Sequence, residues 1–371
     1  MPATAVNSFG LNLLADLAAR QKHKNVFLSP LSVFMALAMT ESGAAGRTQA
    51  AMRQALAVPA DLSEDNLHAS ASALLQSLRA QKGVDLFIAN ALWSDPRLPL
   101  SPAFVERCRK LYEADATTLN LANPAAADTI NGWVKQKTQG MIPAIVSQAA
   151  LAGSLAVLTN AVYFRGRWEY QFGKNETQEG DFHLANGREN RLKKVHFMHR
   201  ESIPGAYRSG DGYEGAALPY ESSEMRLYAI LPAPGKSPEE VLAKMSLDKI
   251  DAPAEPVDLE LRLPRFTLDY SVSLSDSLKR MGMALAFQGG DFTPMGSPKF
   301  FISDVLHKTR LEVDEEGTRA AAATSVIMAA TSAMPRKREK KTLVFDRPFA
   351  LLLRDIQTGA VLFAGVIYDP Q

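Results

Sequence analysis

The chain has 371 residues, of which 46% are hydrophobic and 22% are charged, the composition of an ordinary globular protein with a sizeable core. Its formal net charge of +1 excludes a general electrostatic field for nucleic acid or for a membrane surface. Its one cysteine, Cys108, excludes an internal disulfide framework and a cysteine-rich metal site, so the fold must be stabilised by packing.

Helices are predicted mainly in the first part of the chain. Val6, Phe9, Leu13 and Leu17 follow one another at intervals of three or four residues, which places them on one face of an amphipathic helix. This N-terminal segment lacks the pattern of a signal peptide, and no stretch of the sequence is apolar enough to predict a membrane-spanning helix. Further helices are predicted over residues 30–42, 64–81, 101–112, 123–139 and 271–281.

Strands are predicted mainly in the second part of the chain. Alternation over Val305–Glu315 places His307, Leu311 and Val313 on one face of a strand. The other predicted strands are residues 85–93, expected to be buried on both faces, and residues 155–164, 225–231, 257–263, 343–345, 349–354 and 360–368. No repeat, composition break or linker divides the sequence. We therefore expect one α+β domain over residues 1–371.

The common catalytic and cofactor motifs are absent, among them the nucleophile elbow, the zinc-binding H-E-x-x-H and the glycine-rich phosphate loops. His196 and His199 are close in sequence, but in a strand they would point to opposite faces, so no metal site is predicted. Cys108 lies within a helical pattern and is interpreted as a structural thiol. The sequence therefore predicts neither an enzyme nor a bound cofactor.

Eight strings of residues, in order along nearly the whole chain, resemble the serpins, and in particular inhibitory serpins of prokaryotic type. They are NVFLSPLSVFMAL, GAAGRT, INGWVKQKTQGMI, LAVLTNAVYFRGRWEYQF, ALPYE, LPRFTLDY, VLHKTRLEVDEEGTRAAAAT and FDRPFALLLRDIQTGAVLFAGVIYDP. The resemblance implies a fold of about nine helices around three β-sheets. It also implies a reactive loop, here about residues 315–345, that a serine protease, or a cysteine protease, cleaves. The cleaved loop then inserts as a strand into the central sheet and traps the acyl-enzyme.

The start of the reactive loop has the composition of an insertion arm. The resemblance implies a hinge made of Glu315, Glu316, Gly317, Thr318, Arg319, Ala320, Ala321, Ala322 and Ala323. Small side chains suit insertion, and alternation from Thr318 puts Thr324, Val326 and Met328 on the inward face and Arg319 on the outward face. Arg319 departs from the glutamate common in inhibitory serpins. From propensity alone, the same residues are equally compatible with a helix.

The cleaved bond is placed by the family's spacing of sixteen residues after Glu315, which gives Thr331–Ser332. Ala330 is the neighbouring alternative, and these small residues suit elastase-like or subtilisin-like proteases. The rival site is Arg336, Lys337 and Arg338, which would suit a trypsin-like protease but leaves a longer, slack arm. The basic run from Arg336 to Lys341 is either a solvated loop tip or a docking site for an acidic surface.

Further residues match family positions that control opening of the central sheet. The shutter, a polar cluster under this sheet, is expected to contain Ser29, Ser32, Asn160 and His307. The breach, where the loop first enters, is expected to contain Trp168 and Arg265, the latter paired with Glu315. The inhibitor itself supplies no catalytic residue. The resemblance further favours a monomer in an extracellular or periplasmic compartment, and a non-inhibitory carrier or chaperone is the alternative function.

Overall fold

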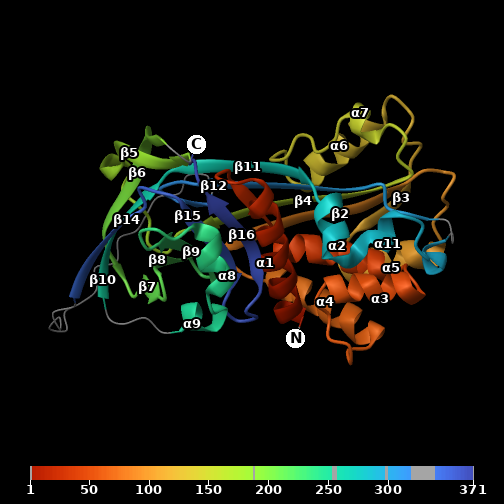
Figure 1. The fold of residues 1–371 in the computed structure, drawn as a ribbon, viewed down its shortest axis with the longest axis horizontal. Coiled ribbons are helices and arrows are strands. Elements are labelled where there is room, and N and C mark those ends of the chain that lie inside the picture. The colour runs from red at the N-terminus through yellow and green to blue at the C-terminus, as the bar shows by residue number, and fades with distance from the viewer. Residues whose placement is uncertain (1, 187–188, 253–256, 297–299, 319–338, 371) are drawn as a thin grey trace.

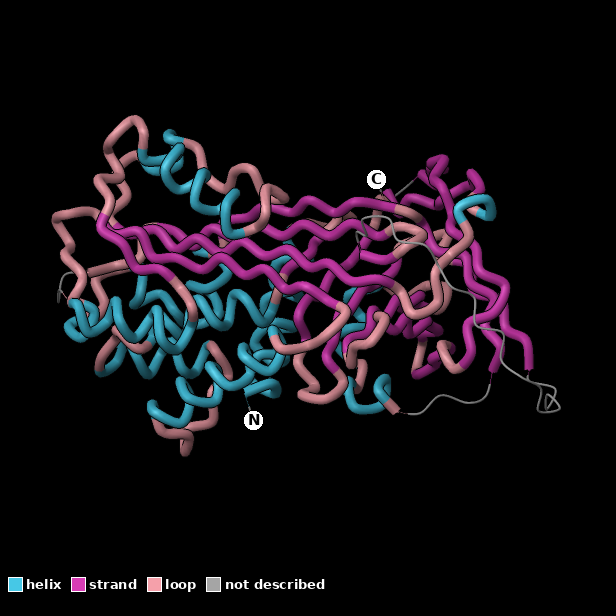
Figure 2. Tube along the Cα trace, turned by 180° about the vertical axis from the view of Figure 1, so that it is seen from behind, coloured by secondary structure: helices cyan, strands magenta, loops and turns pink. Residues whose placement is uncertain are grey.

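The computed structural model describes residues 2–186, 189–252, 257–296, 300–318 and 339–370. A long central sheet runs through the molecule, with helices packed on both of its faces (Figure 1). In the view from behind, most helices lie beneath the sheet, and a smaller helical segment lies on the opposite face (Figure 2). The two faces have separate apolar clusters, the larger beneath the sheet and the smaller under α6.

The central sheet contains the seam that matters for function. Its strands, in spatial order, are β11 (Phe266–Ser273), β12 (Asp304–Val313), β4 (Ala156–Arg167), β2 (Val84–Ser94) and β3 (Asp115–Thr118). The strands β12 and β4 are parallel and pair directly, from Asp304 opposite Val157 to Arg310 opposite Tyr163. Beyond Tyr163, β4 pairs instead with the two-residue strand β13 (Gly317–Thr318).

Two further sheets complete the β structure. The first contains β1 (Val26–Leu28), β16 (Val361–Ile367), β15 (Phe349–Asp355), β9 (Met225–Pro232), β8 (Tyr213–Pro219) and β7 (Tyr207–Gly210). The second contains β14 (Glu339–Val344), β10 (Val257–Pro264), β6 (Glu189–Pro204) and β5 (Gln178–Asn186). Strands β15 and β16 are buried at every residue, as expected for uninterrupted apolar runs at the centre of a packed sheet.

Counted with α10 and α11 as one continuous segment, the described residues contain ten helices, close to the expected number of about nine. They are α1 (Pro2–Arg20), α2 (Pro30–Glu41), α3 (Gly46–Ala55), α4 (Glu64–Arg79), α5 (Pro102–Tyr112), α6 (Ala126–Lys137), α7 (Gln148–Leu151), α8 (Pro238–Lys244), α9 (Leu247–Asp251), α10 (Ser275–Leu278) and α11 (Ala284–Phe287). A π-helical turn, Lys279–Met283, joins α10 to α11, and short 3₁₀ turns occur at Lys174–Glu176 and Thr293–Met295. None of the described helices is long and apolar enough to cross a membrane.

Helix α2 is the central helix of the fold. All of its residues are buried, which is the property of a helix that is surrounded by protein on every side. Its start is fixed by Ser29, whose side chain accepts a hydrogen bond from Ser32 N at 3.2 Å, and by Pro30 in the first turn. The same helix therefore presents Ser29 and Ser32 to the underside of the central sheet and Glu41 to the helices at its other end.

Three local predictions differ from the structure, two in where a helix begins and one in how far a strand is buried. The predicted helix over residues 271–281 begins only at Ser275, because Ser271–Ser273 continue β11 and pair with β12. The predicted helix over residues 123–139 begins at Ala126, because the Asn123 side chain forms a turn with Ala125 N at 2.9 Å. The strand expected to be buried on both faces is only half-buried over Val84–Phe87.

The hairpin of β5 and β6 was not predicted, since its residues are mostly polar and give no clear apolar alternation. For the basic run from Arg336 to Lys341, the expectation of a solvated loop tip is wrong at the C-terminal end. Its last residues, Lys340 and Lys341, belong to β14, which pairs in parallel with β10. The ladder of backbone hydrogen bonds to β10 therefore fixes the C-terminal end of the reactive loop from Glu339 onward.

Candidate functional site

The hinge begins with a tight turn at the end of β12. The backbone N–H of Asp314 donates to Gly317 O at 2.9 Å, and Asp314 Oδ1 accepts from Glu316 N at 2.9 Å and from Gly317 N at 3.0 Å. Gly317 then lies so close to β4 that a Cβ atom on it would be 2.1 Å from Gly166 O. Only glycine fits at this position, and the chain reverses direction to enter the sheet as β13.

Thr318 is already inside the central sheet. Its side chain is fully buried, and its Oγ1 is 2.7 Å from the hydroxyl oxygen of Tyr220. Burial also raises the pKa of Tyr220, so that this phenol stays neutral and can share the hydrogen bond. The sequence-based alternation that placed Thr318 on the inward face agrees with this burial.

The predicted breach residues surround the hinge. The indole Nε1 of Trp168 donates to Asp314 O at 2.9 Å, and its backbone N–H donates to Glu316 O at 3.0 Å. The indole also stacks on Tyr220, with ring centroids 4.7 Å apart. Trp168 therefore fixes both the turn and the phenol that contacts Thr318.

The two hinge glutamates pair with polar side chains of neighbouring segments. Glu315 Oε1 accepts from Thr177 Oγ1 at 2.7 Å and from Arg265 Nη1 at 3.4 Å, and Glu316 pairs with Lys174. The structure thus places Arg265 beside Glu315, as the sequence predicted. It adds Thr177 and Lys174, which no pattern in the sequence singles out.

The predicted shutter residues lie together beneath the middle of the central sheet. Asn160 on β4 is directly opposite His307 on β12, and on its other side it is opposite Asn90 on β2. All three side chains are buried, and Ser29 and Ser32, at the start of α2, form hydrogen bonds with them from the inward face of the sheet. Asn90 was missed, although an amide within the apolar run of β2 was a signal that could have been noticed.

The hydrogen bonds of the shutter form one consistent chain. Ser29 N donates to His307 Nε2 at 3.2 Å, so Nδ1 carries the ring proton and donates to Asn160 Oδ1. The Asn160 amide then donates to Ser32 Oγ at 2.5 Å and to Asn90 Oδ1. The chain joins three strands to α2, and it can be complete only while β12 and β4 are adjacent.

Burial lowers the pKa of His307 to about 3, so the imidazole is neutral at physiological pH. The unfolded chain, with an ordinary histidine pKa near 6.5, binds more protons between these two values. Stability is therefore expected to be complete above pH 6.5 and to fall as the pH decreases toward 3. We expect a loss of about 2 kcal/mol between pH 7 and pH 5 from this residue.

Urea unfolding of the parent and of His307→Gln at the two pH values measures this contribution. The glutamine variant cannot titrate, so its stability should fall by less over the same range. An equal fall in both proteins would show that the acid sensitivity arises elsewhere.

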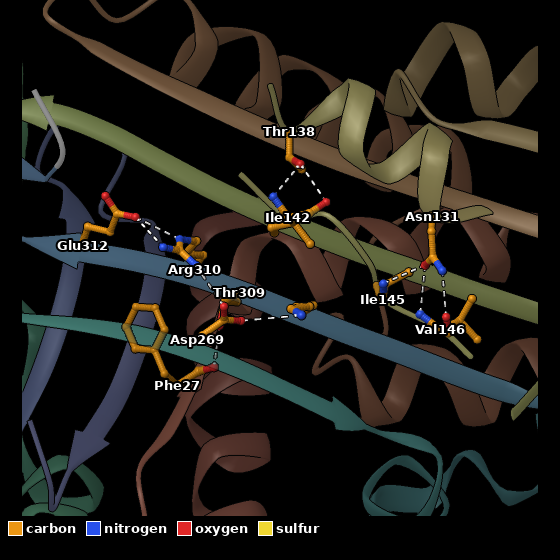
Figure 3. A network of polar contacts seen from close by, with 11 residues as sticks. Phe27, Asn131, Thr138, Ile142, Ile145, Val146, Asp269, Thr309, Arg310 and Glu312 are labelled. Carbon is orange, nitrogen blue, oxygen red and sulfur yellow. Dashed lines mark hydrogen bonds and ion pairs between the residues drawn. The ribbon is translucent and has the colours of Figure 1, made fainter. Parts of the chain in front are cut away.

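Ion pairs on the outward face of the sheet join β12 to β11 (Figure 3). Arg310 Nη1 is 3.0 Å from Asp269 Oδ2, Arg310 Nη2 is 2.7 Å from Glu312 Oε1, and Lys308 Nζ is 3.6 Å from Asp269. On the inward face, Thr309 Oγ1 donates to Phe27 O at 2.9 Å. The two ion pairs of Asp269, with Arg310 and with Lys308, link β11 to β12, so these strands are expected to move together.

Helix α6 and the segment after it cover part of the outward face. Asn131 on α6 accepts from Ile145 N at 2.8 Å and Val146 N at 3.1 Å, and it donates to Val146 O at 2.8 Å (Figure 3). Beneath them, Ile130 and Val134 pack in the smaller apolar cluster with residues of β2 and β4. Helix α6 therefore covers the outward face over β2 and β4.

Other predicted site residues lie outside this region. Thr331, Ser332, Ala330, Arg336, Lys337 and Arg338, together with the hinge residues from Arg319 to Ala323, fall outside the described residues. His199 Nε2 is 3.2 Å from Glu260 Oε1, and His196 is exposed. Within the described ranges, no group of three or more histidine, cysteine or acidic residues could hold a metal ion.

The same architecture is found in solved serpin structures. The native state of tengpin, a thermophilic serpin, has a TM-score of 0.85 and 29% sequence identity, over 98% of this chain and 93% of that chain. Human thyroxine-binding globulin in complex with thyroxine has a TM-score of 0.90 and 25% identity, over 100% of this chain and 98% of that chain. The fold is therefore that of a serpin.

The sequence comparisons identify the family. The family model named Serpin (serine protease inhibitor) matches residues 4–370. An uncharacterized serpin-like protein of Thermococcus kodakarensis is 35% identical over 99% of this chain and 85% of its own length. This chain belongs to the serpin family, whose members are generally not catalysts. Many members inhibit proteases, whereas thyroxine-binding globulin does not.

Proposed function

We propose that this serpin is a suicide inhibitor of serine proteases, and that its cleaved loop inserts between β12 and β4. The observation that carries the proposal is the position of Gly317 and Thr318. They pair with Gly166 and Arg167, on the edge of β4 that faces β12, three residues beyond Tyr163, where the pairing of β12 with β4 ends. The arm therefore starts in the place where an inserted strand would have to begin.

The register of β13 supports a specific inserted state. Gly317 is opposite Arg167 and Thr318 is opposite Gly166, so the pairing is antiparallel. If it continues without a bulge, Met328 comes to lie opposite Ala156, the first residue of β4. Thr331 would then lie just beyond the end of the strand, and a protease attached to it would be carried the full length of the sheet.

The same register gives Thr324 a particular role. It would lie opposite Asn160, on the inward face, between Asn160 and the present position of His307. Insertion would break the hydrogen bond from His307 to Asn160 and would offer the Thr324 hydroxyl in its place. The shutter is therefore a barrier to insertion in the native state, and the arm carries a polar group suited to the opened cluster.

The energetics are sufficient for trapping. About a dozen new backbone hydrogen bonds, each contributing roughly 0.5–1.5 kcal/mol net, could release on the order of 10 kcal/mol. A displacement of about 1 Å at a catalytic site can already lower its rate about 100-fold. Cleavage at Arg336 or beyond would instead leave additional residues in the arm, so the insertion would pull less on the acyl-enzyme.

Incubation with a panel of serine and cysteine proteases, containing elastase-like, subtilisin-like and trypsin-like enzymes, tests the proposal. We expect an SDS-resistant complex with an enzyme that accepts small residues, and a released C-terminal peptide that begins at Ser332. A peptide beginning at Lys337 or Glu339 would move the cleaved bond to the basic run. Cleavage by every protease without any covalent complex would contradict inhibition.

The second candidate is a carrier, as suggested by the likeness to thyroxine-binding globulin. A carrier needs no arm that can insert, so its cleaved form should melt at about the same temperature as the intact protein. The inhibitor is expected to melt at a much higher temperature after cleavage, because the inserted strand stabilises the sheet. Thermal unfolding before and after cleavage separates these two functions.

A further inference from the structure

A buried carboxylate lies at the end of α2 that is remote from the shutter. The side chain of Glu41 is fully buried, and neither of its oxygens makes a hydrogen bond to the described part of the chain. It is within ion-pair distance of Arg53 Nη1 on α3 and of His68 Nε2 on α4, each at 3.5 Å. A buried carboxylate without a hydrogen-bond donor is costly, so this group calls for an explanation.

His68 connects Glu41 to a third buried group. Its Nδ1 is 2.5 Å from the hydroxyl oxygen of Tyr112 on α5, and its Nε2 also lacks a hydrogen bond. Both His68 and Tyr112 are buried. Tyr112, His68 and Glu41 thus form a row that links α5, α4 and α2.

The polar atoms of these three side chains can be hydrogen-bonded in two arrangements, which differ by one proton. With the proton, the Glu41 carboxyl donates to His68 Nε2, and His68 Nδ1–H donates to Tyr112. Without it, Tyr112 donates to His68 Nδ1, and His68 Nε2–H donates to the Glu41 carboxylate. The imidazole is neutral in both arrangements, but its proton changes from one nitrogen to the other.

We propose that Tyr112, His68 and Glu41 form a one-proton switch, in which uptake of a proton by Glu41 reverses the direction of both hydrogen bonds. The proton is exchanged with solvent. Glu64 offers the route, because its side chain is partly exposed and its Oε1 is 3.7 Å from His68 Nε2. The distance of 3.5 Å between His68 Nε2 and Glu41 Oε2 is expected to shorten in either state, because a hydrogen atom then lies between the two atoms.

The surroundings favour exchange near neutral pH. Burial raises the pKa of Glu41 to about 7, although Arg53 opposes this shift, and burial lowers the pKa of His68 to about 4. Glu41 is also the last residue of α2, where the helix dipole disfavours a negative charge. Among the described residues, Arg53 is the only lysine or arginine within 4 Å of Glu41.

Two other ionisable groups, Tyr112 within the row and Cys108 beside it, stay neutral in this range. Arg107 on α5 donates to Ser42 O at 2.5 Å and is 3.9 Å from Glu64. Burial raises the pKa of Cys108 to about 12, and it also raises the pKa of Tyr112, so both groups stay neutral. The switch therefore places or removes a negative charge at one end of α2, whose other end holds the shutter serines.

Nitrogen-15 NMR of histidine-labelled protein tests the switch directly. The six histidines can be assigned by single substitutions, with His68→Gln identifying the relevant ring. We expect His68 to carry its proton on Nδ1 at pH 6 and on Nε2 at pH 8.5, without becoming an imidazolium. A ring that keeps the same tautomer, or that becomes charged, between these pH values would overturn the proposal.

Glu41→Gln provides a matched variant, because its amide donates to His68 Nε2 as the protonated carboxyl does. His68 should then keep its proton on Nδ1 throughout. The ratio of the unfolding constants of parent and variant should change about tenfold between pH 6 and pH 8, since Glu41 ionises only in the parent. A constant ratio would contradict the switch, and the NMR titration of the parent decides the question even if the variant folds poorly.

Discussion

Replacing Thr318 by arginine is expected to convert the serpin from an inhibitor into a substrate of its target protease. Thr318 is fully buried against Tyr220, at the point where the arm enters the sheet. A guanidinium group cannot occupy this position without a cost of several kcal/mol, because it would be desolvated without an anionic partner. The arginine would therefore leave the sheet in the intact protein and would have to be buried when the arm inserts. Each 1.4 kcal/mol added to the insertion barrier slows insertion about tenfold, so at least a tenfold loss of covalent complex is expected.

Titration of each protein with a subtilisin-like protease, read on denaturing gels, measures the partition between covalent complex and cleaved chain. The parent should give complex, whereas Thr318→Arg should give mainly the cleaved chain. Thr318→Ser is the matched control, because it keeps the hydroxyl that meets Tyr220, and it should inhibit nearly as well as the parent. Equal yields of complex for all three proteins would mean that the arm does not insert at this position.

Replacing His307 by alanine should make the native state polymerise or collapse far more readily. The change leaves Ser29 N–H and Asn160 Oδ1 without their partner, and each unsatisfied buried group costs about 1–3 kcal/mol. The missing ring also leaves a cavity between β12 and α2. Because the shutter joins β12 to β4, its loss should let these strands part at a lower temperature.

Native gels after mild heating, combined with thermal unfolding, measure this effect. Thr309→Val is the control, since Thr309 lies on the same face of β12 but its hydroxyl donates to Phe27 O and not to the shutter. Its replacement leaves one buried acceptor without this partner and should cost about 1–3 kcal/mol without loosening the contact between β12 and β4. Equal polymerisation rates for His307→Ala and the parent would contradict a role for the shutter in holding the sheet closed.

The fold was predictable where apolar periodicity is strong. Alternation alone placed His307 on the buried face of β12, and the uninterrupted apolar runs gave β4, β15 and β16. The resemblance to serpins supplied the arrangement of the sheets. The hairpin of β5 and β6 and the end of β11 could not be predicted, because strand pairing overrode weak local preferences.

The site was predictable only in part. Trp168, Arg265, Asn160 and His307 were found through family positions, and the structure places each one beside its expected neighbours. Tyr220 and Thr177 could not be found in this way, whereas Asn90 was signalled only by its position as an amide within an apolar run. Their roles depend on contacts between segments far apart in sequence, such as Tyr220 with Thr318, and a single sequence carries no record of such contacts.

The turn from Asp314 to Gly317 has a kinetic consequence. A hairpin normally forms slowly at first, because the chain must lose entropy to close its turn before the strands gain any hydrogen bonds. Here the turn is already closed by the Asp314 side chain, and the first two residues of the arm are already paired. Nucleation is thus complete before a protease arrives. The rate of insertion should therefore depend on how quickly β12 separates from β4. Opening of the shutter then determines whether the arm inserts before the protease is released.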